Sequence, residues 1–230
     1  MKSWKISASM ICANQGNLES DTIILHNSGV DWFHIDVMDG QFVPRFGMYP
    51  EQVKAIRKHT DKKIDAHMMV MNPEPYINVF ANAGLSLMSV HIENNININR
   101  TIGLIGKANM EAGVILNTST HIESIRWIID NPNLKVVMLL GINPGILGQG
   151  IWNPIYKKAK YLKEYLRDNG RPDIEIQIDG SVKKDNSIEL IKSGFDILVC
   201  GSSTIFRPEE GSLDKNILKY RKDINQGLLL

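Results

Sequence analysis

The stretch Trp32–Met38, which reads WFHIDVM, decides the fold. Side chains alternate along a β-strand, so the apolar residues at positions 33, 35 and 37 share one face, while His34 and Asp36 share the other. Apolar side chains favour contact with covering helices, which directs the histidine and the aspartate toward an interior. The stretch therefore predicts a helix-covered strand whose inner face is polar.

Seven further runs of strand character occur along the chain, and longer segments of helical character separate them. The predicted strands are Lys5–Ile11, Trp32–Val37, Lys63–Met69, Leu87–His91, Gly113–Leu116, Lys135–Ile142, Glu175–Asp179 and Ile197–Cys200. The predicted helices are Leu18–Ser28, Glu51–His59, Pro75–Ala83, Asn99–Glu111, Ile122–Asp130, Pro154–Asn169, Asn186–Ser193 and Leu213–Ile224. Strands and helices that alternate through short connectors form a parallel sheet covered by helices.

Two α/β architectures fit this alternation. An open doubly wound sheet usually has fewer strands and a glycine-rich turn after the first one, but Cys12-Ala13-Asn14 stands there and no GxGxxG follows. A closed (β/α)8 barrel typically takes about 250 residues, which is close to the 230 of this chain. We therefore predict a single TIM-barrel domain over residues 1–230.

Composition excludes several classes of partner. Lys and Arg number 26 against 25 Asp and Glu, and the net charge of +1 provides no field for nucleic acid or anionic lipid. No apolar run approaches the roughly 20 residues of a membrane span. The cysteines Cys12 and Cys200 form neither a disulfide framework nor a CxxC pair, which favours a reducing compartment. We expect a cytoplasmic protein that binds neither nucleic acid nor membrane.

Polar side chains on three predicted strands point into the barrel near the C-terminal ends, where active sites of this fold lie. His34 and Asp36 are joined there by His67 on the third strand and Asp179 on the seventh. A single inward histidine is more often an ordinary hydrogen-bonded core residue. Two histidines and two aspartates at one rim, however, would find partners around a divalent cation. This set of nitrogen and oxygen ligands suits zinc, iron or manganese better than calcium.

Three glycine-rich segments follow the late strands: Asn143–Gln149, Asp179–Ser181 and Gly201–Ser203. Each alone is ordinary turn chemistry. Loops at these places in such barrels often bind phosphate through backbone N–H groups, since glycine lets the main chain approach the oxygens. We therefore expect a phosphate site that needs no basic cluster.

At these residues the sequence resembles the ribulose-phosphate 3-epimerase family, which includes allulose-6-phosphate 3-epimerases. The motifs run in family order over nearly the whole chain, and the H-x-D-x-M-D-G string is the most specific of them. They are His34–Gly40 with Phe42-Val43-Pro44, His67–Val70, His91-Ile92-Glu93, Asn143-Pro144-Gly145 with Gly148-Gln149, Asp179-Gly180-Ser181 and Gly201–Phe206.

The resemblance implies a barrel of the ribulose-phosphate-binding type that binds a phosphorylated ketose and one divalent metal ion, zinc first, with iron, manganese or cobalt as alternatives. It implies metal ligands at His34, Asp36, His67 and Asp179, and an acid/base pair made of the two aspartates. Relatives also suggest a homo-oligomer. The implied substrate and phosphate contacts are Ser9, His67, Gly145, Ile146, Leu147, Gly148, Gly180, Ser181, Gly201 and Ser202, and the implied wall residues are Met38, Met69 and Leu140.

The expected reaction inverts C3 of a ketose phosphate of the ribulose 5-phosphate type. One carboxylate removes the C3 proton, a metal-stabilised enediolate forms, and the other carboxyl returns a proton to the opposite face. Two alternatives stay open: 3-epimerisation of a hexulose 6-phosphate such as allulose 6-phosphate, and phosphosugar binding without catalysis. An orotidylate-type decarboxylase would need Asp-x-Lys-x-x-Asp, whereas Asp36-Val37-Met38-Asp39 lacks the lysine.

The sequence departs from the family pattern around the site but not at the acid/base and metal positions. Ala8 replaces a proline, Gln41 a histidine and Leu140 a methionine. Arg45-Phe46-Gly47 replaces Asn-x-Thr/Ser, and Ile146-Leu147 replaces Phe-Gly or Phe-Ala. The chemistry is therefore expected to be kept, while the sugar stays open.

Overall fold

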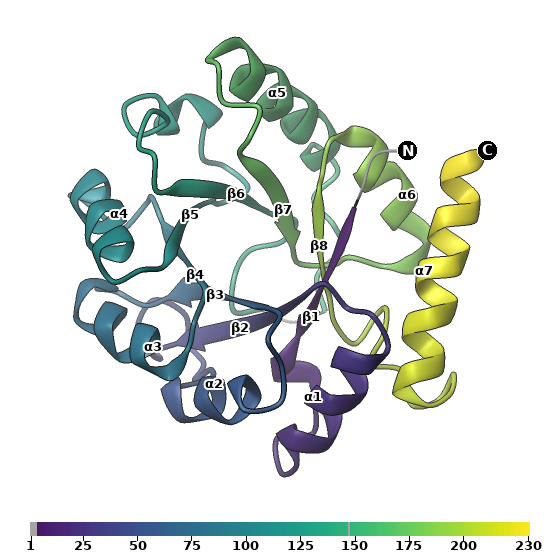
Figure 1. Cartoon of the computed structure of the whole chain (residues 1–230). Coiled ribbons are helices and arrows are strands. Elements are labelled where there is room, and N and C mark those ends of the chain that lie inside the picture. The colour runs from purple at the N-terminus through teal and green to yellow at the C-terminus, as the bar shows by residue number, and fades with distance from the viewer. Residues whose placement is uncertain (1–3, 147) are drawn as a thin grey trace.

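A computed structural model describes residues 4–146 and 148–230, and its strands close into one parallel barrel (Figure 1). The strands pair in chain order, and β8 pairs with β1 to complete the barrel. The strands are β1 (Lys5–Ser9), β2 (Trp32–Met38), β3 (Lys63–Met69), β4 (Leu87–His91), β5 (Glu111–Leu116), β6 (Leu134–Leu140), β7 (Glu175–Asp179) and β8 (Ile197–Cys200). The predicted closed barrel is confirmed, and the open sheet is wrong.

A ring of helices surrounds the strands (Figure 1). The α-helices are α1 (Leu18–Asn27), α2 (Pro50–Arg57), α3 (Ile77–Ala83), α4 (Ile98–Lys107), α5 (Ile155–Asp168), α6 (Lys184–Ser193) and α7 (Leu213–Leu229). The short 3-10 helices in the described ranges are η1 (Met10–Cys12), η2 (Glu74–Tyr76) and η3 (Ile122–Ile125). The predicted last helix ended too early, because α7 continues to Leu229.

The predicted α-helix Ile122–Asp130 is wrong, because a 3-10 turn and irregular turns connect β5 to β6. The buried isoleucines Ile122, Ile125 and Ile128 recur every third residue, and Ile129 is buried next to the last of them. That spacing matches three residues per turn rather than 3.6. The backbone agrees, since the N–H of Ile128 donates to the carbonyl of Ile125.

The barrel interior is built in layers. At its N-terminal end, a buried apolar floor comes from the four even-numbered strands, as expected for alternating layers in this fold. The floor residues are Trp32, Leu87, Val136 and Ile197. Above them lies a polar layer from odd-numbered strands, in which the fully buried Asp65 accepts hydrogen bonds from Ser7 Oγ (2.7 Å) and Gln177 Nε2 (2.9 Å). Apolar material thus closes one end of the barrel, and polar groups lead toward the other.

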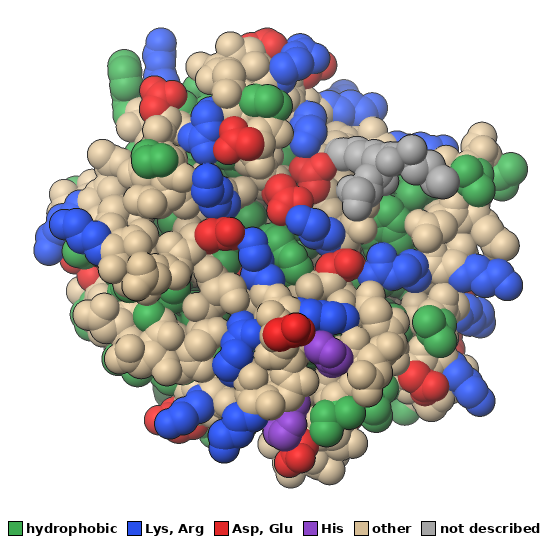
Figure 2. All heavy atoms as spheres, viewed as in Figure 1, with side chains coloured by type: hydrophobic (Ala, Val, Ile, Leu, Met, Phe, Trp, Pro, Cys, Tyr) green, Lys and Arg blue, Asp and Glu red, His purple; other side chains and the backbone are tan. Residues whose placement is uncertain are grey.

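The main core lies between the strands and the helices. Phe33 and Ile35 of β2 and Ile176 of β7 are fully buried there, as the alternation of side chains predicts. On the face seen in Figure 2, Lys and Arg side chains are interspersed with Asp and Glu. Within the described part of the chain, no helix has the length and apolar character to cross a membrane.

The loop after β2 packs directly on the strand that carries Asp36. The N–H of Met48 donates to the carbonyl of Asp36 (2.7 Å), and the N–H of Gly47 donates to that of Met38 (3.2 Å). A Cβ atom at Gly47 would lie 2.3 Å from the Asp36 carbonyl oxygen and 2.6 Å from the Met38 nitrogen. Only glycine allows this approach of two backbones.

Replacing Gly47 with alanine should destabilise the protein, because the added methyl group meets backbone atoms that cannot rotate away. We expect the free energy of unfolding to fall by about 1–3 kcal/mol, as for overpacked interiors, measured by chemical denaturation. Gly103→Ala in α4 is the matched control, since a Cβ there meets nothing within 4 Å, and it should instead gain about 0.5–1 kcal/mol. Equal stability of the Gly47→Ala variant and the parent would contradict this packing.

Candidate active site

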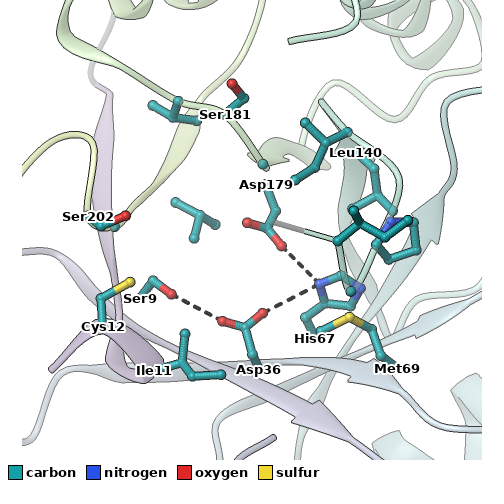
Figure 3. Close-up of a pocket in the computed structure, with 18 of the residues that line it drawn as sticks. Ser9, Ile11, Cys12, Asp36, His67, Met69, Leu140, Asp179, Ser181 and Ser202 are labelled. Atoms are coloured by element: carbon teal, nitrogen blue, oxygen red, sulfur yellow. Dashed lines mark hydrogen bonds and ion pairs between the residues drawn. The ribbon is translucent and has the colours of Figure 1, made fainter. Parts of the chain in front are cut away.

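Two histidines and two aspartates from β2, β3 and β7 meet at the C-terminal mouth of the barrel. One ligand atom from each of His34, Asp36, His67 and Asp179 lies within 4.8 Å of every other. His67 Nδ1 lies 2.9 Å from Asp179 Oδ2 and 3.8 Å from Asp36 Oδ1. Asp36 and Asp179 approach His67 from two sides (Figure 3). The predicted convergence of these four side chains is therefore present.

The cluster fits a cation. His34 is fully buried, and its Nε2 has no hydrogen-bond partner among the described residues. This nitrogen faces Asp36 Oδ1 at 3.6 Å and Asp179 Oδ2 at 3.9 Å, both beyond hydrogen-bond distance. An orphaned buried nitrogen is costly unless something occupies the space before it. Two imidazole and two carboxylate donors around that space are a set that zinc and similar ions accept.

Asp65 orients His34. Its Oδ2 lies 2.6 Å from His34 Nδ1, and the two residues are register partners on β3 and β2. An ionised carboxylate accepts the Nδ1 proton, which leaves the lone pair of Nε2 facing the cluster. Asp65 stands two residues before His67, so the alternation of side chains puts both on the inner face of β3, but alternation alone gives Asp65 no role. The signal it lacked was the register between β2 and β3, which makes the two side chains neighbours.

The pKa values of His34 and Asp36 shift in opposite directions. Burial alone would lower the pKa of His34, but the charge of Asp65, and the hydrogen bond and charge of Asp36, raise it well above its ordinary value. Burial alone would raise the pKa of Asp36, but the hydrogen bond and charge of His34, with help from His67 and Ser9, lower it. Positive charge at His34 and negative charge at Asp36 therefore stabilise each other. A metal ion that binds His34 through Nε2 needs that nitrogen free of a proton, so its binding would depend on pH.

A second polar group lies on the other side of His67. Burial is the largest influence on His91 and lowers its pKa to about 4. Burial alone would raise the pKa of Glu93, but hydrogen bonds with His91, Thr120 and the Asn117 N–H lower it to about 2. At neutral pH a neutral imidazole therefore stands beside a carboxylate.

Most of the predicted substrate-contact and wall residues line one pocket above the cluster (Figure 3). Ser9 Oγ donates to Asp36 Oδ2 at 3.1 Å, so this serine is held beside the carboxylate. Met38 and Met69 are 8% and 4% exposed and pack with Val43. Leu140 also lines the pocket but packs with Ile115 and Met138.

The glycine-rich loops form the opposite side of the pocket. Six residues predicted to bind phosphate line it, namely Gly145, Ile146, Gly180, Ser181, Gly201 and Ser202. Gly180 has φ of +98° and Ser181 has φ of +55°, so two successive residues adopt the left-handed region. Gly148 lies in the loop after β6 but does not line the pocket, and Leu147 lies outside the described residues.

Several residues of the pocket lining were not predicted as site residues, and two of them, Arg45 and Cys12, carry reactive or charged groups. Arg45 extends from the loop after β2, and Cys12 from the end of η1. Arg45 was noted only as a departure from the family pattern. Its side chain makes no hydrogen bond or ion pair among the described residues, so a cationic group is available at the pocket.

Comparison with known proteins agrees with this geometry. Residues 5–206 match the Ribulose-phosphate 3 epimerase family. The chain belongs to this family. It is 37% identical over 199 residues to the ribulose-phosphate 3-epimerase of Bacillus subtilis (strain 168), covering 86% of this chain and 91% of that protein. It is 40% identical over 174 residues to the enzyme of Aquifex aeolicus (strain VF5), covering 76% and 77%.

Solved structures share the fold of this epimerase at low sequence identity. A ligand complex of KGPDC from Streptococcus mutans has a TM-score of 0.76 at 14% identity and covers 97% of this chain and 98% of its own. The 3-hexulose-6-phosphate synthase from Salmonella typhimurium has a TM-score of 0.61 at 14% identity and covers 98% of each chain. These likenesses concern the barrel, while family membership makes the protein an isomerase.

Asp65→Asn should lower the stability of the epimerase while leaving all four residues of the cluster unchanged in the sequence. The amide would place a donor or a weaker acceptor before three donors, on Ser7, His34 and Gln177. Because the site is fully buried, we expect a loss of about 3–5 kcal/mol in unfolding free energy, measured by urea denaturation at pH 7. Asp61→Asn, with a 93% exposed side chain, is the control and should match the parent. An unchanged Asp65→Asn variant would show that Asp65 does not hold His34.

Proposed function

We propose that this epimerase inverts C3 of ribulose 5-phosphate, giving xylulose 5-phosphate. One carboxyl group removes the C3 proton and a second one returns a proton to the opposite face. The observation that carries the proposal is the meeting of Asp36 and Asp179 beside His34 and His67 at the barrel mouth. The curated relatives named as ribulose-phosphate 3-epimerases support the choice of substrate.

Asp36 and Asp179 act in turn on opposite faces of C3. They come from β2 and β7 and enter the pocket from different sides (Figure 3). One begins as a carboxylate and removes the weakly acidic proton, while the other begins protonated and delivers a proton to the other face. Ser9 holds Asp36 in place through its hydroxyl group.

His34, Asp36, His67 and Asp179 would hold one divalent ion, and their mixed nitrogen and oxygen donors make zinc our first expectation. Such an ion would stabilise negative charge that develops on the substrate oxygens, an effect worth several kcal/mol. His67 also lines the pocket, so its ring can contact the bound sugar.

The rest of the pocket binds and shields the sugar. The backbone at Gly180 and Gly201, and the hydroxyl groups of Ser181 and Ser202, would hold the phosphate, since they lie along one side of the pocket. Met38, Met69 and Leu140 would exclude water from the reacting carbon. Exclusion of water matters because it protects the carbanion-like centre and strengthens nearby charges.

Asp36→Asn and Asp179→Asn should each lower turnover on ribulose 5-phosphate by about a thousandfold, because neither amide can transfer a proton. Turnover is measured with a coupled assay for xylulose 5-phosphate, and circular dichroism checks the fold. The exposed Asp61→Asn control should keep full activity. Near-parental turnover in either site variant would remove that residue from the acid/base pair.

Turnover in D2O should place deuterium at C3 of the product, because the returning proton comes from a carboxyl group that exchanges with solvent. NMR follows the label with ribulose 5-phosphate and, in parallel, with allulose 6-phosphate. If deuterium entered only allulose 6-phosphate, the hexulose phosphate rather than the pentose phosphate would be the substrate. Epimerised product without label would contradict the two-carboxyl transfer, and no turnover of either sugar would favour a phosphosugar-binding protein.

A further inference from the structure

His91 on β4 connects the cluster to a carboxylate at the rim. Its ring is 1% exposed, and its Nε2 lies 2.9 Å from His67 Nε2. Its Nδ1 lies 3.0 Å from Glu93 Oε2. His67, His91 and Glu93 therefore form an unbroken chain of contacts that runs away from the pocket, behind the nitrogen that faces the two aspartates.

Hydrogen-bond chemistry fixes the direction of this chain. Glu93 is an acceptor at its Oε2, so the proton on Nδ1 of His91 is donated to it. A His91 ring whose single proton lies on Nδ1 has its lone pair on Nε2, and two imidazole nitrogens can bond only if one of them carries a proton. The donor must be Nε2–H of His67. His67 is left with its lone pair on Nδ1, the atom that lies 2.9 Å from Asp179 Oδ2. Two acceptor atoms at this distance need a proton or a metal ion between them.

Glu93 is held firmly enough to set this direction. Its Oε1 accepts a hydrogen bond from the N–H of Asn117 at 2.7 Å and another from the hydroxyl of Thr120. These bonds leave Oε2 for His91. The carboxylate is therefore fixed from the loop after β5, although its side chain is 27% exposed.

The connection between the two histidines is shielded. The ring of Phe42 packs on that of His91 with centroids 4.6 Å apart, and the rings of His67 and His91 are 5.0 Å apart. Phe42 also packs against the apolar wall formed by Met38, Val43 and Met69. Water is thus kept from competing for the lone pair of His91.

We propose that His91 and Glu93 are positioning residues that hold His67 in the tautomer whose Nδ1 lone pair faces the ligand cluster. The inference rests on the proposed metal site, and it assigns a role to the His91-Ile92-Glu93 motif, which the reaction itself does not use. His34 has a charged partner, Asp65, in direct contact. His67 instead receives its support through a neutral ring, with the carboxylate one residue further away.

The first test reads the positions of the protons in the unmodified protein. Long-range ¹H–¹⁵N correlation spectra of histidine-labelled, zinc-loaded enzyme distinguish protonated, bare and metal-bound ring nitrogens. We expect His67 to bind zinc through Nδ1 and carry its proton on Nε2, and His91 to carry its proton on Nδ1. Zinc on Nε2 of His67, or a proton on Nε2 of His91, would overturn the proposal without any substitution.

The second test compares two substitutions of His91 by zinc affinity, measured by competition with a chelator. His91→Phe keeps a ring but removes the acceptor, and it should weaken zinc binding roughly 10- to 100-fold, as loss of an outer-shell partner does. His91→Gln keeps an amide acceptor at a similar reach and should restore much of that loss. Ser89→Ala, also on β4, is the control, because Ser89 Oγ has no partner among the described residues, and its affinity should be parental.

The outcomes separate this proposal from the proposed reaction. Parental zinc affinity in folded His91→Phe, with normal epimerase activity in the parent, would overturn the role of His91 and leave the reaction standing. The expected tautomers and affinity loss in a protein that epimerises no ketose phosphate would support the role of His91 and overturn the reaction. If His91→Phe does not fold, the spectra of the parent decide.

Discussion

Two buried imidazoles and two carboxylates share a space in which their ligand atoms lie within 4.8 Å of one another. Groups of this kind are costly in a barrel interior unless opposite charge is present among them. The unpartnered Nε2 of His34 shows that hydrogen bonds among the described protein groups do not satisfy the cluster. The need for positive charge at this point explains why supporting residues behind both histidines orient lone pairs toward one spot.

The barrel makes this arrangement possible by separating its layers. An apolar floor closes the N-terminal end, and the Ser7–Asp65–Gln177 layer above it carries His34. The mouth is left for the acidic groups and the sugar. The loop after β2 also helps to position Asp36, because Gly47 lets the loop lie against the backbone at that residue. Packing, orientation and charge therefore act on the same four side chains.

Much of this could be predicted from the sequence, because strand alternation is visible in it. The polar positions of β2, β3 and β7 stand between apolar ones, so the inward direction of His34, His67 and Asp179 follows from period two. The role of Asp65 could not be predicted, since it depends on register between strands. The helix predicted at Ile122–Asp130 was wrong because β-branched residues at a spacing of three suit a tighter turn. The family motifs contained His91 and Glu93, but only their distances to His67 suggest what they do.

The central claim is that one divalent ion is bound by side chains from three different strands. Anomalous diffraction from crystals of the zinc-loaded enzyme, recorded on both sides of the zinc absorption edge, tests it most directly. We expect a single strong peak about 2.0–2.2 Å from a nitrogen of each histidine and an oxygen of each aspartate. A peak elsewhere, or an ion that contacts only one strand at the barrel mouth, would contradict it.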